Sequence, residues 1–306
     1  MAKHKVTMRD IAKECNVSVA TVSYVLNHTD NEKISHDTCL KVMEAATYLH
    51  YIPSALAKRS VGHKNNLVGI IINLKSHNTP GKKLIYYDLA AELSNCVRLL
   101  GFETIIITNK DLQKDFTVIT KHSLDAVFMI DVDNNMVGKI TKDYFVPIIF
   151  LDCEVDEYLF CKIYPNYPAL FQKAKAILHA DTLFLAMEDI YSQRLKERMI
   201  KGFPAKDIFI NTPNSDLHLF LQTHSKSKGI ILSDILALQA ELYMDTQDFV
   251  VVSSLGNAHM LLPDTQTIFI RNKSKAAAAA ETLQKMLRLD YKANEGNRIL
   301  LECESQ

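Results

Sequence analysis

The sequence predicts a small all-α unit at the N-terminus, followed by a two-lobed α/β core with parallel sheets and helices on both sheet faces. Short helical segments fill the first 52 residues, after which apolar, β-branched runs without polar alternation begin. These runs alternate with helical stretches in two consecutive sets of similar size. We therefore divide the chain into a headpiece (1–52), a linker (53–66) and a core (67–306).

Composition and charge limit the class of protein. The 306 residues are enough for two or three folded units. No apolar run approaches the ~20 residues that span a bilayer, and the start lacks a signal-peptide stretch, so we expect a cytoplasmic protein. The six cysteines form no Cys-x-x-Cys pair, and we expect no disulfide framework, metal site or cofactor. Residues 1–64 hold 9 Lys and Arg against 6 Asp and Glu, a mild positive excess that suits DNA.

The headpiece opens with two short helices joined by a tight turn. Thr7 is a good N-cap for the first helix, and Asp10 completes a capping-box-like pair. Ser18 is the expected N-cap of the second helix, which follows the turn at 15–17. Two helices at this spacing predict a helix-turn-helix, which places its second helix in a DNA major groove. The expected inward-facing residues are Ile11, Ala12, Val22, Val25 and Leu26.

A third helix and a linker complete the predicted headpiece region. The helix starts at Ser35, and Pro53 ends its pattern. Its apolar side has Leu40, Met43, Ala46 or Thr47, and Leu49 at helical spacing. The linker is small, polar and basic, and residues 54–60 suit partial helix.

Nine strands are expected in the core. The first set is 67–74, 103–109, 125–132 and 147–154, with a long helix over 83–100. The second set is 182–187, 206–211, 228–233, 248–254 and 267–270, followed by a helix over 274–289. Two such sets predict two lobes that face a cleft.

The exposed positions of the second helix are candidates for DNA contact. Val19 and Ala20 are apolar and suit a thymine methyl group, whereas Tyr24 suits a base or a phosphate. Short polar groups nearby suit phosphate oxygens, which set the register without specifying sequence. The predicted DNA-binding positions of the headpiece are Thr7, Ser18, Val19, Ala20, Thr21, Ser23, Tyr24, Asn27 and His28.

Three segments together resemble the headpiece of the lac-repressor (LacI/GalR) family of bacterial transcription regulators. They read VTMRDIAKECNVSVATVSYVLN from Val6, then ISHDT, then LHYIPSALAK. The strand order resembles the same family's core, a periplasmic-binding-protein-like pair of lobes. The resemblance implies a homodimer on a pseudo-palindromic operator, with two hinge helices side by side in the minor groove. By motif position, Val19, Ala20 and Tyr24 fall where the family contacts the major groove.

The hinge departs from the family pattern at one position. Ala57 and Lys58 match the family's Ala-Arg pair. Ser60 stands where family members usually have a leucine that wedges between the central base pairs. A serine cannot supply an apolar wedge that unstacks and kinks a step. Val61 takes that place if the hinge register shifts by one residue.

The resemblance also assigns residues to a small-molecule effector between the lobes. The stretch 232–238 resembles the one whose aspartate binds effector, which points to Asp234. The stretch 192–203 resembles the one with an effector-binding arginine, and its spacing leaves Arg194 and Arg198 both open. These groups suit a hydroxylated or anionic ligand. The alternative is a surface arginine and a helix-capping aspartate.

The function that these features favour is a sequence-specific transcription regulator, a repressor controlled by a sugar-like or anionic small molecule. A regulator that has lost ligand sensing is one alternative, because Ser253-Ser254-Leu255 replaces the family's Gly-Phe-Asp. A soluble ligand-binding protein with a vestigial headpiece is another. No nucleophile, phosphate-loop, dinucleotide or metalloprotease motif is present, so we expect no enzyme. The two adjacent lysines in the turn 78–83 suit an anion, but we expect a solvated turn.

Replacing Ser60 by leucine tests the role of the hinge. We expect Ser60→Leu to increase operator affinity or DNA bending, because leucine supplies the missing apolar wedge. Gel-shift affinity and circular-permutation bending assays measure both quantities. Unchanged affinity together with unchanged bending would show that the hinge contacts DNA in another way.

Overall fold

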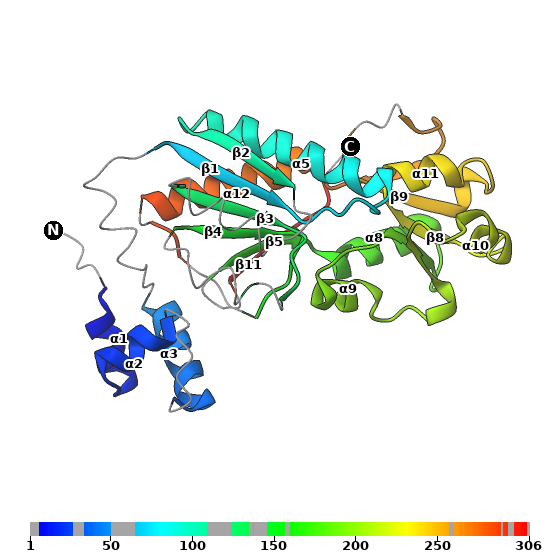
Figure 1. The fold of residues 1–306 in the computed structure, drawn as a ribbon. Coiled ribbons are helices and arrows are strands. Elements are labelled where there is room, and N and C mark those ends of the chain that lie inside the picture. Colours follow the sequence, from blue (N-terminus) through cyan, green and yellow to red (C-terminus); the bar gives the residue numbers. More distant parts are fainter. Residues whose placement is uncertain are drawn as a thin grey trace.

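The computed structural model describes residues 6–26, 34–49, 65–108, 124–134, 137, 146–156, 160–256, 260–288, 290–292 and 297–304. Within these ranges a three-helix headpiece precedes a core of two lobes, each built on a parallel sheet (Figure 1). The predicted linker falls almost wholly outside the described ranges, so its boundaries stay a prediction.

The headpiece helices pack around one small apolar cluster. They are α1 (Met8–Cys15), α2 (Val19–Leu26) and α3 (His36–Tyr48). Every inward residue predicted for α1 and α2 is buried in this cluster. Ala46 is buried as predicted and Leu49 packs against the cluster, but Val42 and Ala45 are buried without having been predicted. The side chains of Leu40, Met43 and Thr47 lie outside the description.

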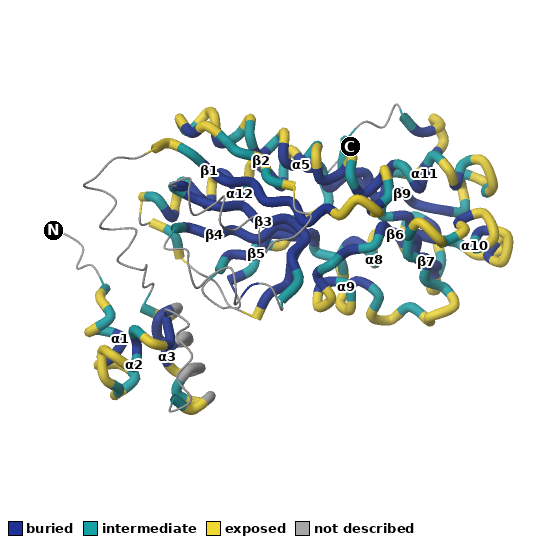
Figure 2. The backbone as a smooth tube through the Cα atoms, in the orientation of Figure 1, coloured by how far each residue is buried: buried dark blue, intermediate teal, exposed yellow. Residues whose placement is uncertain are grey.

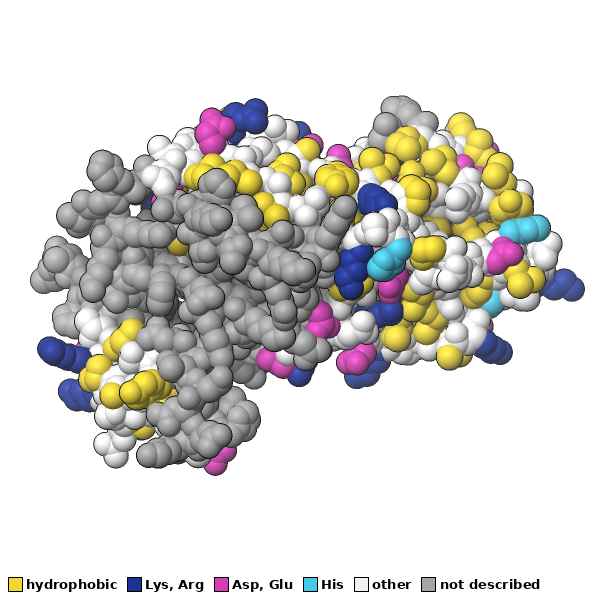
Figure 3. Space-filling model, in the orientation of Figure 1, with side chains coloured by type: hydrophobic (Ala, Val, Ile, Leu, Met, Phe, Trp, Pro, Cys, Tyr) yellow, Lys and Arg dark blue, Asp and Glu magenta, His cyan; other side chains and the backbone are white. Residues whose placement is uncertain are grey.

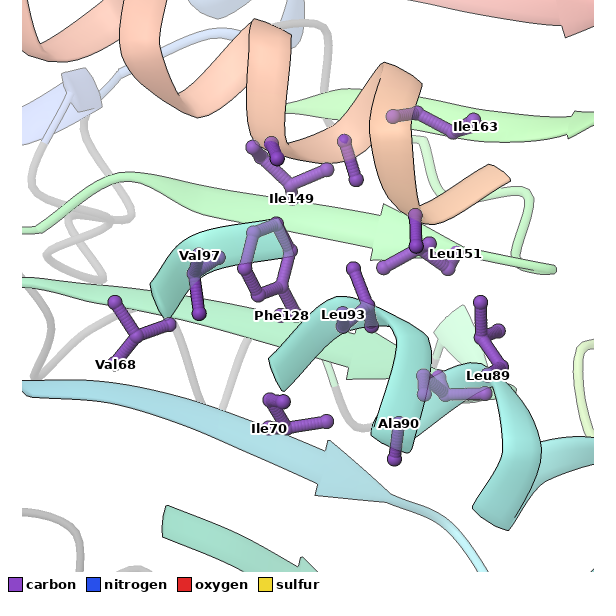
Figure 4. Close-up of a cluster of buried hydrophobic side chains, with 14 of the residues drawn as sticks. Val68, Ile70, Leu89, Ala90, Leu93, Val97, Phe128, Ile149, Leu151 and Ile163 are labelled. Atoms are coloured by element: carbon purple, nitrogen blue, oxygen red, sulfur yellow. The ribbon is translucent and has the colours of Figure 1, made fainter. Parts of the chain in front are cut away.

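The first lobe has a six-stranded sheet in the order β11-β5-β4-β3-β1-β2. Helices α5 (Pro80–Arg98) and α12 (Asn272–Leu287) pack against each other and against one face of the sheet. Figure 4 shows Leu89, Leu93 and Val97 of α5 in one cluster with Ile70, Phe128 and Leu151 from the strands. The strands are β1 (Leu67–Ile72), β2 (Glu103–Thr108), β3 (Ala126–Ile130), β4 (Ile148–Leu151), β5 (Cys161–Pro165) and β11 (Arg298–Leu301).

The second lobe has a five-stranded sheet in the order β10-β9-β8-β6-β7, with helices on both faces. One face packs on α8 (Tyr167–Leu178) and α9 (Gln193–Ile200), and the other on α10 (Leu217–Thr223) and α11 (Asp234–Ala240). The central strands of both sheets form the buried interior (Figure 2). They are β6 (Phe184–Glu188), β7 (Ile208–Asn211), β8 (Gly229–Leu232), β9 (Phe249–Ser253) and β10 (Gln266–Phe269); two 3-10 turns lie at Ala205–Asp207 and Thr246–Asp248.

All nine predicted strands occur, but the sequence did not predict β5 and β11. Both are short and contain a cation, Lys162 in β5 and Arg298 in β11, which breaks the apolar run that signals a buried strand. Strand β2 is less buried than its neighbours. This strand lies at a sheet edge and leaves Ile106 exposed.

Gly229 provides a test of packing in the second lobe. It is the register partner of Phe184, and a β-carbon built at Gly229 would lie 2.1 Å from the Phe184 ring. That ring is buried against Phe220, so it has little room to move. We expect Gly229→Ala to lower the free energy of unfolding by about 1–3 kcal/mol, measured by urea denaturation. Adding Phe184→Leu should restore part of the loss; a wild-type midpoint for the single variant would contradict this packing.

Candidate DNA-recognition headpiece and interlobe site

The two predicted helix caps of the headpiece are present. The Thr7 backbone N–H and hydroxyl both donate to Asp10 Oδ2 at 2.7 Å, which completes the predicted capping box of α1. Asn16 ends α1 in the left-handed region, with φ of 54°. Ser18 Oγ accepts the Thr21 backbone N–H at 3.0 Å, so the first turn of α2 is fixed.

Helix α2 presents the predicted surface. Val19 and Tyr24 are each 43% exposed, and Ala20 is exposed as well. Thr21 and Ser23 are half-buried, and the Thr21 hydroxyl shares a hydrogen bond with Ser18. The exposed side of α2 is therefore largely apolar, as the sequence indicated. The predicted DNA contacts Asn27, His28, Ala57, Lys58 and Ser60 lie outside the described residues.

The boundary between the lobes is built around the buried carboxylate of Asp131, which follows β3 in the first lobe. Its Oδ1 accepts the backbone N–H groups of Tyr191 and Ser192, from the second lobe, at 2.7 and 3.1 Å. Its Oδ2 lies 2.7 Å from the Lys82 ammonium of α5, in an ion pair that lacks hydrogen-bond alignment. Lys82 Nζ also lies 3.8 Å from the centre of the Tyr191 ring. One carboxylate thus joins the two lobes.

A second buried ion pair lies in the first lobe beside this contact. Lys275 of α12 donates to Asp152 Oδ1 and Oδ2 at 2.8 and 2.6 Å. Asp152 follows β4 as Asp131 follows β3, and both have positive φ, near 50°. Both carboxylates therefore stand at the carboxyl end of the sheet, which is where α/β sheets commonly bind ligands.

Glu188 provides the matching group at the end of β6 in the second lobe. Its carboxylate accepts from Thr79 at 2.6 Å and Asn211 at 3.0 Å. Burial raises the pKa of Glu188, against the opposing effect of these hydrogen bonds. A β-carbon at Gly81 would lie 2.2 Å from Glu188 Oε1, so a glycine is needed where α5 approaches this group.

The central cavity between the lobes is small. We use this name for the space bordered by Lys82, Lys275, Glu188 and the residues around them. Its volume is about 80 Å³, whereas pockets for small molecules usually measure roughly 300–1,000 Å³. Side chains of the protein itself fill most of the space between the two lobes at this place. The other lining residues are Ile85, Tyr86, Asp152, Pro165, Tyr167, Leu170, Met187, Ile190, Leu195, Met199, Leu232, Val252, Ser254 and Ile270.

A larger and strongly polar space, the outer groove, opens beside the central cavity. Its volume is about 370 Å³. One wall comes from the segment after β4 together with β5 and β11, and the other from α9 and the residue after it. The described lining residues are Glu154, Val155, Asp156, Lys162, Arg194, Glu197, Arg198, Lys201 and Arg298.

The structure places the three predicted effector residues in two different places. Arg194 and Arg198 both border the outer groove, where Arg194 pairs with Asp156 and Arg198 lies 3.7 Å from Glu154. Asp234 is fully buried elsewhere and accepts the Ser254 backbone N–H at 3.0 Å. Asp234 borders neither the central cavity nor the outer groove. Its buried carboxylate instead holds the loop after β9 in place. The effector assignment of all three residues stays a prediction.

Sequence reasoning missed the burial of Lys82 and Lys275. The turn at 78–83 was expected to be solvated; this is wrong for Lys82, which is 2% exposed. The missed signal is helical spacing. Lys82 lies three, seven and eleven residues before the buried Ile85, Leu89 and Leu93. Lys275 lies four, seven and eleven residues before the buried Ala279, Thr282 and Met286, so each lysine occupies a core position of its helix.

Residues 7–54 match the family model described as bacterial regulatory proteins, lacI family. The chain carries a lacI-family headpiece. The predicted resemblance is thus confirmed over α1, α2, α3 and the residues that follow them.

The similarity to curated proteins extends beyond the headpiece into the core. Catabolite control protein A of Priestia megaterium is 34% identical over 141 residues, which are 45% of this chain and 39% of that protein. HTH-type transcriptional regulator pepR1 of Lactobacillus delbrueckii subsp. lactis is 25% identical over 187 residues, which are 59% of this chain and 54% of that protein. The chain spans about half the length, or less, of the curated relatives it matches. The names are those of regulators, which agrees with the expectation that the chain is not an enzyme.

Solved structures confirm the predicted two-lobed fold. The transcriptional regulator CelR in complex with cellobiose has a TM-score of 0.58 at 14% identity, with 98% of both chains covered. The lac repressor dimer bound to operator and the anti-inducer ONPF has a TM-score of 0.57 at 15% identity, covering 98% of this chain and 97% of the other. In the part of the chain that the structure describes, no helix is long and apolar enough to cross a membrane.

The pH dependence of Asp131 tests the buried contact between the lobes. Burial raises the pKa of its carboxyl to about 6, although Lys82 and the two amides oppose that rise. Because the carboxyl of an unfolded chain has a pKa of about 3.9, the native state binds this proton more tightly. The contribution of Asp131 to the free energy of unfolding should therefore fall as pH rises from about 4 to 6. Carbon-13 NMR of labelled aspartates should show one titration near pH 6 that disappears in Asp131→Asn; a midpoint near 4 would contradict the assignment.

Proposed function

We propose that this chain is a sequence-specific DNA-binding transcription regulator that acts as a repressor on a pseudo-palindromic operator. The lacI-family headpiece supports this proposal more than any other observation. Its second helix is capped at Ser18, and it exposes Val19, Ala20 and Tyr24 beside the capped turn. That arrangement suits entry of the helix into a major groove. The cationic residues Arg9 and Lys13 are exposed on α1 and suit the DNA backbone.

A homodimer is part of the proposal, because two half-sites need two headpieces. Leu84, Tyr87 and Ala91 form an exposed face along α5 of the first lobe. Leu242 and Tyr243 lie exposed just after α11 in the second lobe. Figure 3 shows hydrophobic side chains gathered along α5 and again over the second lobe. A second copy of the chain is the partner that we propose for these surfaces.

One observation about ligand control favours a second candidate function. A lacI-type fold is solved with cellobiose in CelR and with ONPF in lac repressor. In this chain the central cavity measures about 80 Å³ and is bordered by internally paired lysines. A DNA-binding regulator whose central cavity holds no ligand is therefore the second candidate.

Replacing Tyr24 tests the proposed DNA contact. We expect Tyr24→Ala to weaken operator binding about tenfold and to relax preference at one base position, since an exposed contact of the recognition helix is lost. Selection from random DNA followed by sequencing identifies the operator and measures the preference. Binding affinities at several salt concentrations then separate base contacts from phosphate contacts.

Tyr48→Ala is the matched control, because Tyr48 is an exposed tyrosine on α3 of the same headpiece. The control should bind the selected operator as the wild type does. If the wild-type protein selects no palindromic sequence, the proposed function is wrong. Equal selection profiles for Tyr24→Ala and the wild type would show that Tyr24 is not a base contact.

A further inference from the structure

The outer groove has properties that the central cavity lacks, and we propose that it is a binding site for a small oxyanion. The ligand class is a metabolite with phosphate or carboxylate groups, bound between Arg194, Arg198 and Lys201 on one wall and Arg298 on the other. The inference rests on the proposed function only for its effect on DNA binding. It locates ligand binding outside the central cavity.

Size is the first argument. The outer groove encloses about 370 Å³, which lies within the usual range for small-molecule pockets, whereas the central cavity lies far below that range. The central cavity is also closed by two buried ion pairs, Lys82 with Asp131 and Lys275 with Asp152. Opening the central cavity would take the Tyr191 and Ser192 N–H groups of the second lobe away from the buried Asp131 carboxylate, which is costly. The outer groove needs no such change.

Charge is the second argument. The described lining of the outer groove has five cationic and three carboxylate side chains, a surplus of two positive charges. Guanidinium groups bind phosphate and carboxylate groups through paired, charge-assisted hydrogen bonds. Val155 is the one apolar residue among the described lining residues, so a neutral apolar or aromatic ligand has little to pack against.

The arrangement of β5 and β11 concentrates positive charge on the first-lobe wall of the groove. Arg298 and Lys162 are register partners in this parallel pair, so their side chains lie on the same face. Like charges placed so close are unfavourable unless an anionic group lies nearby. Glu154 is that group on the protein itself. Arg298 donates to Glu154 from Nη2 at 2.6 Å, and Tyr164 donates to it as well.

These contacts fix Glu154 as a charged acceptor. Burial alone would raise its pKa, but hydrogen bonds from Arg298 and Tyr164 hold the pKa of Glu154 below its usual value. Its attraction for Arg298 therefore persists at neutral pH. Arg198 lies 3.7 Å from this already occupied carboxylate and is half-exposed, so its guanidinium is available to an anion in the groove.

The position of the groove gives an anion a way to act on both lobes. Arg194, Arg198 and Lys201 belong to the second lobe, and Arg298 belongs to the first. The Arg194–Asp156 pair already crosses between the lobes at the groove. An anion that bridges Arg198 and Arg298 adds a second charged link across the same boundary. Binding therefore favours the closed arrangement of the lobes and changes operator affinity through the spacing of the two headpieces.

The experiment uses the full chain with inorganic phosphate, citrate and glucose as probes, at constant ionic strength set with sodium chloride. Isothermal titration calorimetry measures binding, and operator affinity is measured with and without each probe. We expect citrate or phosphate to bind and glucose not to bind. Binding by phosphate alone identifies a phosphorylated metabolite, and binding by citrate alone identifies a polycarboxylate.

The double variant Arg198→Gln, Lys201→Gln should weaken binding of the effective anion about tenfold or more, because two charge-assisted contacts are lost. The double variant Lys206→Gln, Lys226→Gln is the control; it removes the same charge from exposed positions of the same lobe. The proposal is overturned if neither anion binds, or if both double variants lose binding equally. Loss of operator selection by the wild-type protein would instead count against the proposed function, since calorimetry does not depend on DNA.

Discussion

The arrangement of the two lobes depends on one buried carboxylate. Asp131 follows β3 of the first lobe and accepts two backbone N–H groups from the segment before α9 of the second lobe. A buried charge is tolerated only when it is paired and hydrogen-bonded, so Asp131 restricts what can lie around it. Lys82 must lie close to Asp131, and the Tyr191 ring must cover Lys82. The lobes must also stay together, so that the two second-lobe amides reach the Asp131 carboxylate. The closed central cavity follows from these requirements.

The same constraint separates two regions of the interlobe boundary with different chemistry. Near Asp131, the charges are buried and paired within the protein, and little space remains. Toward α9 and β11, the charges are more numerous, partly exposed and unequal in sign. In this chain the larger polar space between the lobes therefore lies toward α9 and β11 and not around Asp131.

Periodicity in the sequence was sufficient to predict most of the fold. The capping pair Thr7–Asp10, the capped start at Ser18 and the buried stripes of α1 and α2 all occur as predicted, because they depend on residues close in sequence. Strands β5 and β11 could not be predicted, because Lys162 and Arg298 interrupt the apolar runs that indicate buried strands. Asp234 was assigned from a motif, but its partners in the loop after β9 are set by tertiary packing. Helical spacing places Lys82 and Lys275 at core positions, but their ion-pair partners Asp131 and Asp152 lie in other elements, which spacing does not reveal.

Strand β11 has a consequence for how the chain assembles. The whole second lobe, from α8 to β10, lies in sequence between β5 and the α12–β11 segment that completes the first sheet. During synthesis the second lobe can fold while the first still lacks α12, one edge strand and Arg298. The first lobe and the outer groove are therefore finished last, by residues 298–301 pairing with β5. A chain that stops shortly before residue 298 would lack β11 and could not complete the first sheet. We infer that such a chain would expose the edge of β5 and be recognised by cellular quality control as partly folded.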